Sequence, residues 1–390
     1  VEDIPVLSYT LSLYQAHNNL PGYNAIMWDF MKHYSVEVDD NNNVQRYYSP
    51  SGFVEDDEVE IFAEEAEPGL KAINFDEVEA PTTFDKNKAN KLPLNGYFEK
   101  TLAFDGETRT AKVYLPEGIP VRAYYTVIAV ADDVDTEEFL EESGWIALAD
   151  EREEGLFILE PGNDGWGSYE EEMDYVNAAI GFFSSNSYFS IFGEHYFVGY
   201  GAGAPVLEAW AAANPLKVIG QVYVNSQGLN GEYLNQFASI EFDGKNGNYV
   251  EIEFPEGFEK ITYNEALLPT WYINPDSAYI DSFNYWKEAN DCEATPVSDD
   301  EFGEIYPQKV DSLRWMTSHS GPISKVALLN DEDFNVAGTA ERIYDFLSYY
   351  TRYENAVAYG NQLSVRADYD KLGIEIRTIV VEGELREYLV

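Results

Sequence analysis

A glycine-rich segment in the middle of the chain lies between an apolar strand-like stretch and a helical one. It reads Gly199-Tyr200-Gly201-Ala202-Gly203. A turn between a strand and a helix is where the G-x-S-x-G pattern presents a serine nucleophile, because small neighbours let the serine oxygen stand clear. Here Gly201 occupies the nucleophile position, and glycine has no side chain that could form an acyl-enzyme. We therefore expect no ordinary serine-esterase chemistry at this turn.

A dinucleotide-binding turn is the alternative interpretation of the same glycines, since such turns also join a strand to a helix. The spacing argues against it, because Val206 stands where the pattern G-x-G-x-x-G requires a third glycine. The segment also comes late in the chain, whereas the dinucleotide fingerprint belongs to the first βα unit.

The elements that position this turn alternate between apolar strands and helical stretches over residues 97–350. A hairpin is expected at Lys100–Pro116, turning at Asp105-Gly106. Further strands are expected at Tyr125–Ala131, Leu156–Leu159, His195–Gly199, Val218–Val224, Thr270–Ile273 and Lys325–Leu329. Helices are expected at Thr136–Glu154, Tyr169–Phe183, Ala204–Ala213 and Thr339–Tyr350. This alternation predicts an α/β fold with a mostly parallel sheet flanked by helices.

Three segments together carry a resemblance to a known family. They are the strand–turn–helix YFVGYGAGAPVLEAWAAANP, the run from Trp145 to Pro161, and the segment from Leu268 to Asp276. Over residues 97–352 the chain resembles the polyhydroxybutyrate-depolymerase and feruloyl-esterase-like branch of the α/β hydrolases. The resemblance implies an α/β-hydrolase-like sheet and a serine–histidine–acid site at the turn.

The chain departs from that family at the catalytic positions. Asp276 stands where the resemblance places the acidic member, although a turn aspartate after Pro275 is an equal interpretation. The loop at residues 330–335, where the histidine is expected, contains none. Ala131-Asp132-Asp133 replaces the oxyanion-hole glycines, and carboxylates would repel an oxyanion. Together these losses indicate a degenerate module that kept the scaffold and lost the reaction.

Three histidines and several aromatic residues are candidates for site residues. His17 lies where the catalytic histidine of a preceding module would fall, or it is a surface-loop histidine. His195 and His319 are interpreted as structural. Trp166, Tyr169 and Tyr200 are expected to line whatever cleft remains beside the turn. Other aromatic residues could form a stacking platform for sugars or an interface, or could be ordinary packing: Tyr47, Tyr48, Trp271, Tyr272, Tyr285 and Trp286.

The charge of the chain excludes some partners. The formal net charge is −47, from 71 acidic and 24 basic residues. Nucleic acids and anionic membranes would be repelled by such a surface. The single cysteine excludes an internal disulfide framework, and no apolar run is long enough to span a membrane. The composition favours an extracellular or cell-surface location.

Residues 51–91 form an acidic stretch that breaks the α/β pattern. A solvated linker or insertion is one interpretation, and a calcium site is the alternative, because clustered carboxylates suit a hard cation. Asp132, Asp133 and Asp135 are weak candidates of the same kind, since neither region has the EF-hand spacing. No other cofactor is expected.

Both ends of the chain resemble parts of its middle, either as partial repeats of one module or by chance likeness between short amphipathic segments. Residues 377–386 align without a gap onto 100–109, and residues 28–35 align onto 344–351. We therefore expect four regions: the C-terminal part of a preceding module (1–50), the acidic linker (51–91), an α/β-hydrolase-like domain (92–352), and a linker with the opening hairpin of a following module (353–390).

These observations support three functional hypotheses. The first is a catalytically silent, esterase-like module used for binding or self-assembly, with other copies or modules as partners and carbohydrate or polyester as further candidates. The second is an active ester hydrolase that uses residues outside this chain or an unrecognised nucleophile. The third is a calcium- or carbohydrate-binding structural protein.

Overall fold

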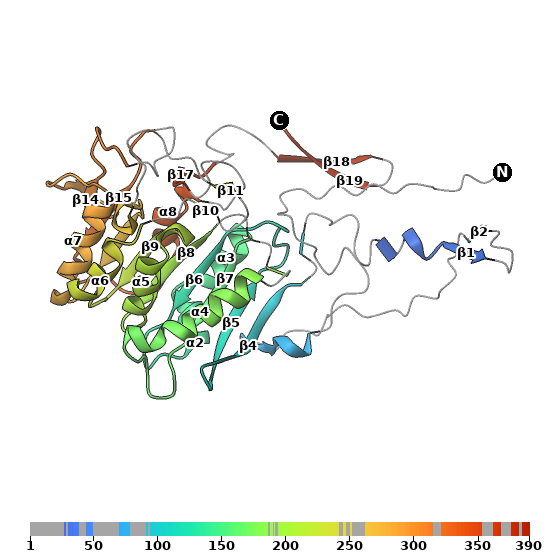
Figure 1. Cartoon of the computed structure of the whole chain (residues 1–390), viewed down its shortest axis with the longest axis horizontal. Helices are drawn as coiled ribbons and strands as arrows, with labels where there is room; N and C mark the ends of the chain where they lie inside the picture. Colours follow the sequence, from blue (N-terminus) through green and yellow to red (C-terminus); the bar gives the residue numbers. More distant parts are fainter. Residues whose placement is uncertain are drawn as a thin grey trace.

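The protein is built around one sheet of 11 strands (Figure 1). The computed structural model describes residues 27–28, 30–38, 44–49, 70–78, 91–92, 94–185, 188–189, 191, 194–241, 245–246, 250–251, 262–314, 321–352, 362–367, 376–381 and 384–390. The strand order across the sheet is β13-β14-β15-β12-β9-β8-β6-β7-β5-β4-β3. Its six central strands, from β15 to β7, run parallel to one another.

The strands of the sheet follow the predicted apolar runs closely. The first hairpin pairs β4 (Gly96–Phe104) with β5 (Glu107–Leu115). The parallel strands are β6 (Tyr125–Ala129), β7 (Gly155–Leu159), β8 (His195–Tyr200), β9 (Val218–Val224), β12 (Thr270–Ile273) and β15 (Lys325–Leu329). At the edges lie β3 (Ile73–Asn74), β13 (Val297–Asp299) and β14 (Gly303–Pro307).

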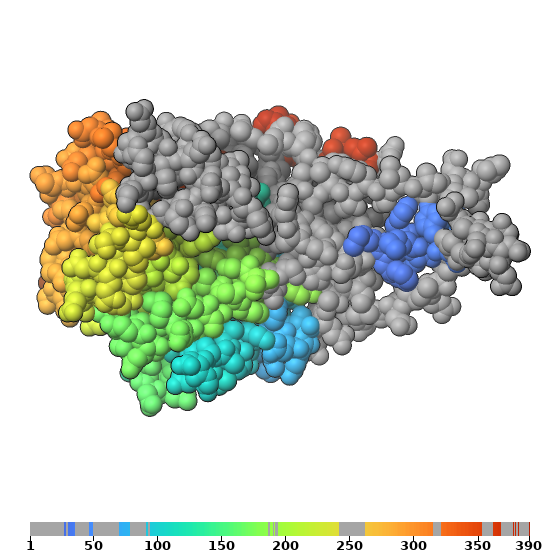
Figure 2. Space-filling model, in the orientation of Figure 1, coloured from blue at the N-terminus to red at the C-terminus, as the bar shows by residue number. Residues whose placement is uncertain are grey.

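Helices cover both faces of the sheet. One face packs against α4 (Tyr169–Ser185), α5 (Gly203–Ala213), α6 (Gly231–Ala238) and α7 (Ile280–Ala289). The other packs against α2 (Thr136–Glu142), α3 (Trp145–Arg152) and α8 (Ala340–Leu347). Because both faces are covered, β6, β7, β8, β9 and β12 are buried along their whole length. Figure 2 shows, at the surface on this side, the green and yellow segments that carry α4 and α6.

This architecture confirms the predicted α/β fold, a mostly parallel sheet flanked by helices. The Asp105-Gly106 turn is also where it was expected, and both residues have positive φ (41° and 84°), as a tight two-residue hairpin requires. The stretch predicted as one helix at 136–154 is instead two helices, α2 and α3. Gly144 lies between them, and its φ of 88° is incompatible with a continuous α-helix. Helices α6 and α7 and the antiparallel extension β13–β14 were not predicted.

Short 3-10 helices and small two-stranded sheets complete the described elements. The 3-10 helices are η1 (Phe75–Glu77), η3 (Pro215–Lys217), η4 (Tyr263–Glu265) and η5 (Ser277–Tyr279). The small sheets pair β1 (Tyr34–Val38) with β2 (Val44–Tyr48), β10 (Lys245–Asn246) with β11 (Val250–Glu251), β16 (Tyr350–Thr351) with β17 (Ser364–Val365), and β18 (Ile376–Val381) with β19 (Glu384–Leu389). Among the described residues, no helix is long and apolar enough to cross a bilayer.

Candidate functional site

The turn after β8 has the strand–turn–helix geometry expected of a nucleophile elbow. Gly201 has φ at +53°, in the left-handed region, and α5 begins two residues later at Gly203. The Gly201 amide donates to the carbonyl of Val224 at 2.9 Å, which ties the turn to the end of β9. The position where a nucleophile would stand is therefore held in place, but it carries no reacting atom.

The glycines on either side of Gly201 are required by close packing. A Cβ at Gly199 would lie 2.4 Å from the Cα of Ala204, and one at Gly203 would lie 2.8 Å from the Val130 carbonyl oxygen. At Gly201 the nearest atom, the Ala131 Cβ, would be 3.2 Å away. Position 201 is thus the one where a side chain fits with the smallest shift, although its backbone conformation disfavours most residues.

Asp276 is used by the local backbone. Its side chain accepts a hydrogen bond from the Ala278 amide at 3.1 Å, and so caps η5. It also accepts one from the Ser277 hydroxyl at 3.2 Å, and it is exposed. These contacts are those of a turn aspartate, which was one of the two interpretations of Asp276.

The loop expected to carry a histidine is bonded to the neighbouring strand end. Asn274, at the end of β12, accepts from the Asp331 amide at 2.7 Å and donates to the Asp331 carbonyl at 2.8 Å. These two hydrogen bonds join the ends of β12 and β15, so polar groups at this edge serve to hold loops together. This role of Asn274 was not predicted, because its partner lies 57 residues away in sequence.

Of the two described histidines, neither lies at the turn. His195 begins β8 and is buried, and burial, together with the nearby charge of Lys217, lowers its pKa to about 4. His33 contacts the Ser49 carbonyl at 2.8 Å beside the β1–β2 hairpin. His17 and His319 lie outside the described residues.

Asp132 and Asp135, two of the weak metal candidates, hold backbone amides in place. Asp132 accepts from the Trp166 amide at 2.8 Å, and Asp135 caps α2 by accepting from the Glu138 amide at 3.0 Å. Asp133, the third candidate, is exposed and adopts a positive φ of 58°. Within the described part of the chain, no three His, Cys, Asp or Glu side chains are grouped as metal ligands. The candidate cation site is therefore not assembled from these three aspartates.

Of the three residues expected to line a cleft, Tyr200 is instead part of the core. It is 2% exposed, its hydroxyl accepts from the Trp145 indole at 2.9 Å, and its ring packs edge-on against Phe139. The expectation was wrong because Tyr200 ends a strand whose side chains alternate between two covered faces. Tyr169 is partly exposed, and its hydroxyl accepts from Asn230 at 2.6 Å.

Trp166 connects the turn to the main pocket of this region. Its indole nitrogen donates to the Val130 carbonyl at 2.7 Å and lies 3.0 Å from where a Cβ of Gly203 would be. Its ring lies 5.1 Å from the Arg109 guanidinium, within reach of a cation–π interaction. Trp166 therefore packs beside the turn on one side and contacts a pocket-lining cation on the other.

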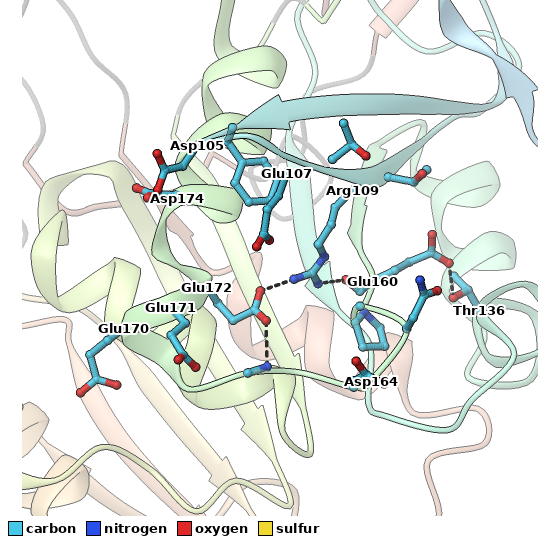
Figure 3. A pocket seen from close by; sticks show the side chains of 18 of the residues that line it. Asp105, Glu107, Arg109, Thr136, Glu160, Asp164, Glu170, Glu171, Glu172 and Asp174 are labelled. Carbon is cyan, nitrogen blue, oxygen red and sulfur yellow. Dashed lines mark hydrogen bonds and ion pairs between the residues drawn. The ribbon is translucent and has the colours of Figure 1, made fainter.

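That pocket is a concavity of about 1010 Å³ formed by β5, the loop after β7 and the start of α4 (Figure 3). None of residues 199–203 lines it. Among the described residues that line it, Arg109 is the only cation. The acidic lining residues are Asp105, Glu107, Glu160, Asp164, Glu170, Glu171, Glu172 and Asp174. Trp166 and Tyr169, which were expected to line a cleft, are not among its lining residues. This pocket was not predicted, because its lining comes from segments far apart in the chain.

Arg109 organises the pocket floor. Its guanidinium pairs with Glu172 and donates to the Glu160 carbonyl, and it stacks 4.0 Å from the ring centre of Tyr175. Glu172 also accepts from the Gly167 amide at 2.8 Å and is 6% exposed. This buried pair joins β5 to α4 and fixes the loop that carries Trp166.

A second cation and carboxylate cluster adjoins this floor. Lys112 lies 2.7 Å from Glu137 and 2.8 Å from Glu160. Burial lowers the Lys112 pKa, but its hydrogen bonds to the two carboxylates outweigh burial and raise it. Lys112 therefore stays charged and neutralises part of the acidic wall.

A buried carboxyl lies behind the turn, in α5. Glu208 is fully buried and accepts from the Tyr272 hydroxyl at 2.5 Å and the Trp286 indole at 2.9 Å. Burial raises its pKa to about 7, despite the opposing effect of these hydrogen bonds. Trp271, Tyr272 and Trp286 are fully buried, so they belong to the core and not to a surface platform for sugars.

No protein-family model matches the sequence, and no curated protein sequence does either. Among solved structures, the acetyl xylan esterase from Aspergillus awamori is 10% identical, with a TM-score of 0.37, over 61% of this chain and 93% of that one. Est1E from Butyrivibrio proteoclasticus is 12% identical, with a TM-score of 0.34, over 49% of this chain and 84% of that one. The esterase domain of a Rhodothermus marinus protein is 14% identical, with a TM-score of 0.31, over 50% and 82%.

Proposed function

We propose that residues 92–352 form a catalytically silent, esterase-like module that serves in binding or self-assembly. The observation that carries the proposal is Gly201, which occupies the apex of a correctly formed strand–turn–helix and offers no nucleophilic atom there. An ester hydrolase of the serine type needs that atom, a base beside it and donors for the oxyanion.

The surroundings of the turn support the same proposal. The loop after β15 has no histidine, and Asn274 bonds it to β12. Asp276 caps a 3-10 helix, and Asp132 holds the Trp166 amide. Asn274, Asp276 and Asp132 therefore each serve the local backbone.

The acidic pocket is the best candidate surface for a ligand of the module. Its volume is in the range of small-molecule sites, and it is lined by polar groups whose positions are fixed by the Arg109–Glu172 pair. A neutral polyhydroxylated ligand such as a carbohydrate, or a cationic group, suits this lining better than an anion. An extracellular or cell-surface location is part of the proposal, and it rests on the net charge of −47.

Covalent labelling tests catalytic silence directly. The full chain is incubated with a fluorophosphonate probe and, separately, with p-nitrophenyl acetate, beside an active serine esterase as the positive control. We expect no labelled chain and no hydrolysis above the buffer rate. Stoichiometric labelling, traced by mass spectrometry to one residue of this chain, would reject the proposal and favour the active-hydrolase hypothesis.

A further inference from the structure

The last hairpin of the chain has the same strand register as the first hairpin of the sheet. Val381 faces Glu384 across β18–β19, as Phe104 faces Glu107 across β4–β5. The remaining pairs of β18–β19, out to Ile376 and Leu389, match the β4–β5 register at the same sequence offset. In sequence, Glu382-Gly383 aligns with Asp105-Gly106. The shared register follows from the equal spacing between the paired strands.

The β1–β2 hairpin is similar to the β16–β17 pair at the end of the central domain, although the two do not align without a gap. Tyr34 pairs with Tyr48, and Tyr350 pairs with Val365, which lies one residue further along the chain from its partner. A backbone hydrogen bond of 2.9 Å follows each pair, from Ser49 to His33 in one case and from Arg366 to Tyr349 in the other. Helical residues precede both hairpins, at 27–28 and 30–31 and in α8.

The repeated elements differ in burial. Leu102, in β4, is 6% exposed, and its counterpart Ile379, in β18, is 50% exposed. Phe104 packs against the core, whereas its counterpart Val381 is 45% exposed. The same apolar pattern that faces the core in β4 therefore faces solvent in β18.

The helical residues near the start show the same contrast. Met27, Trp28 and Met31 are 50%, 44% and 58% exposed. Their counterparts in α8 are among the core residues that cover one face of the sheet: Ile343, Tyr344 and Leu347, at 0%, 4% and 0% exposed. In Figure 1 both terminal hairpins lie outside the sheet of 11 strands. Exposed apolar side chains of this kind mark a contact surface when they recur as a pattern.

We propose that β18–β19 docks onto a further module of the same fold as residues 92–352, and pairs with that module's counterpart of β7 as β5 pairs with β7. The proposal deepens the self-assembly part of the proposed function and rests on it. The exposed Ile379 and Val381 would then take the core positions of Leu102 and Phe104. Arg386 aligns with Arg109, so the partner module should present a carboxylate in the position of Glu172.

A second copy of this chain is a poor partner for the hairpin. In the central domain, the edge of β7 is already paired with β5 from Ala111 to Tyr114. Docking there would require the resident hairpin to leave, with the loss of the buried Leu102 and the Arg109–Glu172 pair. The partner that fits is a module whose own sheet starts at the β6 counterpart and lacks a first hairpin.

An extended protein tests this pairing in the full chain. Residues 114–367 are added directly after Val390, which aligns with Val113, so that β18–β19 takes the place of the first hairpin in the added copy. The added residues include Leu363, which is buried in the core, and Arg366, which pairs with the buried Glu154. We expect the added copy to fold, and hydrogen exchange of the β18–β19 amides to slow by at least about tenfold relative to the original chain. A second extended protein, which adds residues 92–367 with their own hairpin, sets the reference for a folded added copy.

Two variants of the first extended protein decide the outcome. I379D with V381D should remove the protection of both the hairpin and the added copy, while the melting temperature of the original central domain stays unchanged. The conservative pair I379V with V381I should keep the protection. The proposal is overturned if the added copy stays unfolded while the complete reference copy folds, or if it folds equally well with the two aspartates. Catalytic silence is tested separately by probe labelling, so either idea can fail alone.

Discussion

The turn at Gly201 and the acidic pocket lie on opposite sides of Trp166, and they differ in what they contain. The turn is closely packed, with glycines at 199 and 203 whose Cβ atoms would meet backbone atoms, and its one ionisable side chain, Tyr200, is buried in the core. The pocket is open and lined by eight acidic residues and Arg109. In a hydrolase, the open space and the ionisable groups would converge on the turn. Here the ionisable groups line a pocket to which none of residues 199–203 contributes.

The largest effect is expected from filling the closest packed glycine of the turn. Gly199→Val would bring a Cβ to 2.4 Å from the Ala204 Cα, which is backbone and cannot move aside. We expect a loss of about 4 kcal/mol in the free energy of unfolding, or no soluble protein. Urea unfolding measures it. Gly181→Ala is the matched control, because nothing lies within 4 Å of that Cβ and alanine favours the helix. Equal stability of the two variants would mean that the turn is not closely packed.

Removing the charge of Arg109 in the pocket should destabilise the fold more than removing the charge of an exposed arginine. Arg109→Met leaves the buried Glu172 carboxylate without its partner, and we expect a loss of about 3 kcal/mol in the free energy of unfolding. Arg152→Met is the control, since Arg152 is 42% exposed and lies 3.6 Å from Glu151, so its loss should be under about 1 kcal/mol. Adding Glu172→Gln to Arg109→Met should recover part of the loss. No recovery would argue against an unpaired carboxylate as the cause.

Glu208 gives the domain a pH dependence that originates behind the turn. Its pKa is about 7 in the folded protein, above its ordinary value, so the folded state holds this proton more tightly than the unfolded chain does. Stability from this group is fully present below the unfolded pKa and falls as pH rises to about 7. We expect Glu208→Gln to flatten this part of the stability profile and to gain on the order of 2 kcal/mol over the native protein at pH 8.

Urea midpoints measured from pH 4 to 8 check this expectation. Tyr272 and Tyr223 are the titratable groups with electrostatic interactions with Glu208, and burial raises both of their pKa values well above the ordinary range. They stay neutral across this pH window, so a difference between the two proteins reports Glu208. Parallel profiles for the native protein and Glu208→Gln would show that Glu208 does not titrate there.

The smallest effect is expected from putting a nucleophile back at the apex. Gly201→Ser places a side chain at φ +53° and at 3.2 Å from the Ala131 Cβ, which should cost about 1 kcal/mol. We expect no hydrolysis of p-nitrophenyl acetate above the native protein, because a serine without a base and oxyanion donors stays unreactive. A burst of product from this variant would show that the remaining catalytic groups are present after all.

The elements of the domain could be predicted because they depend on local patterns. Apolar runs of the right length gave β6, β9, β12 and β15, and the Asp105-Gly106 turn gave the first hairpin. The helix predicted at 136–154 was divided by Gly144, and α7 was missed, because tertiary packing decided which of its half-polar residues became buried. The glycine turn between β8 and α5 could also be predicted, because it depends only on residues that are adjacent in sequence.

The sequence by itself determined the order of strands and helices, the glycine at the turn and the excess of negative charge. These are properties of neighbouring residues or of the whole composition. Only the tertiary structure decided that Tyr200 is buried, that Asp132 and Asp276 bind backbone amides, and that Arg109 meets Glu172 across 63 residues of sequence. The physical reason is that a side chain's partner is chosen by the packing of distant elements, and local periodicity carries no information about that choice.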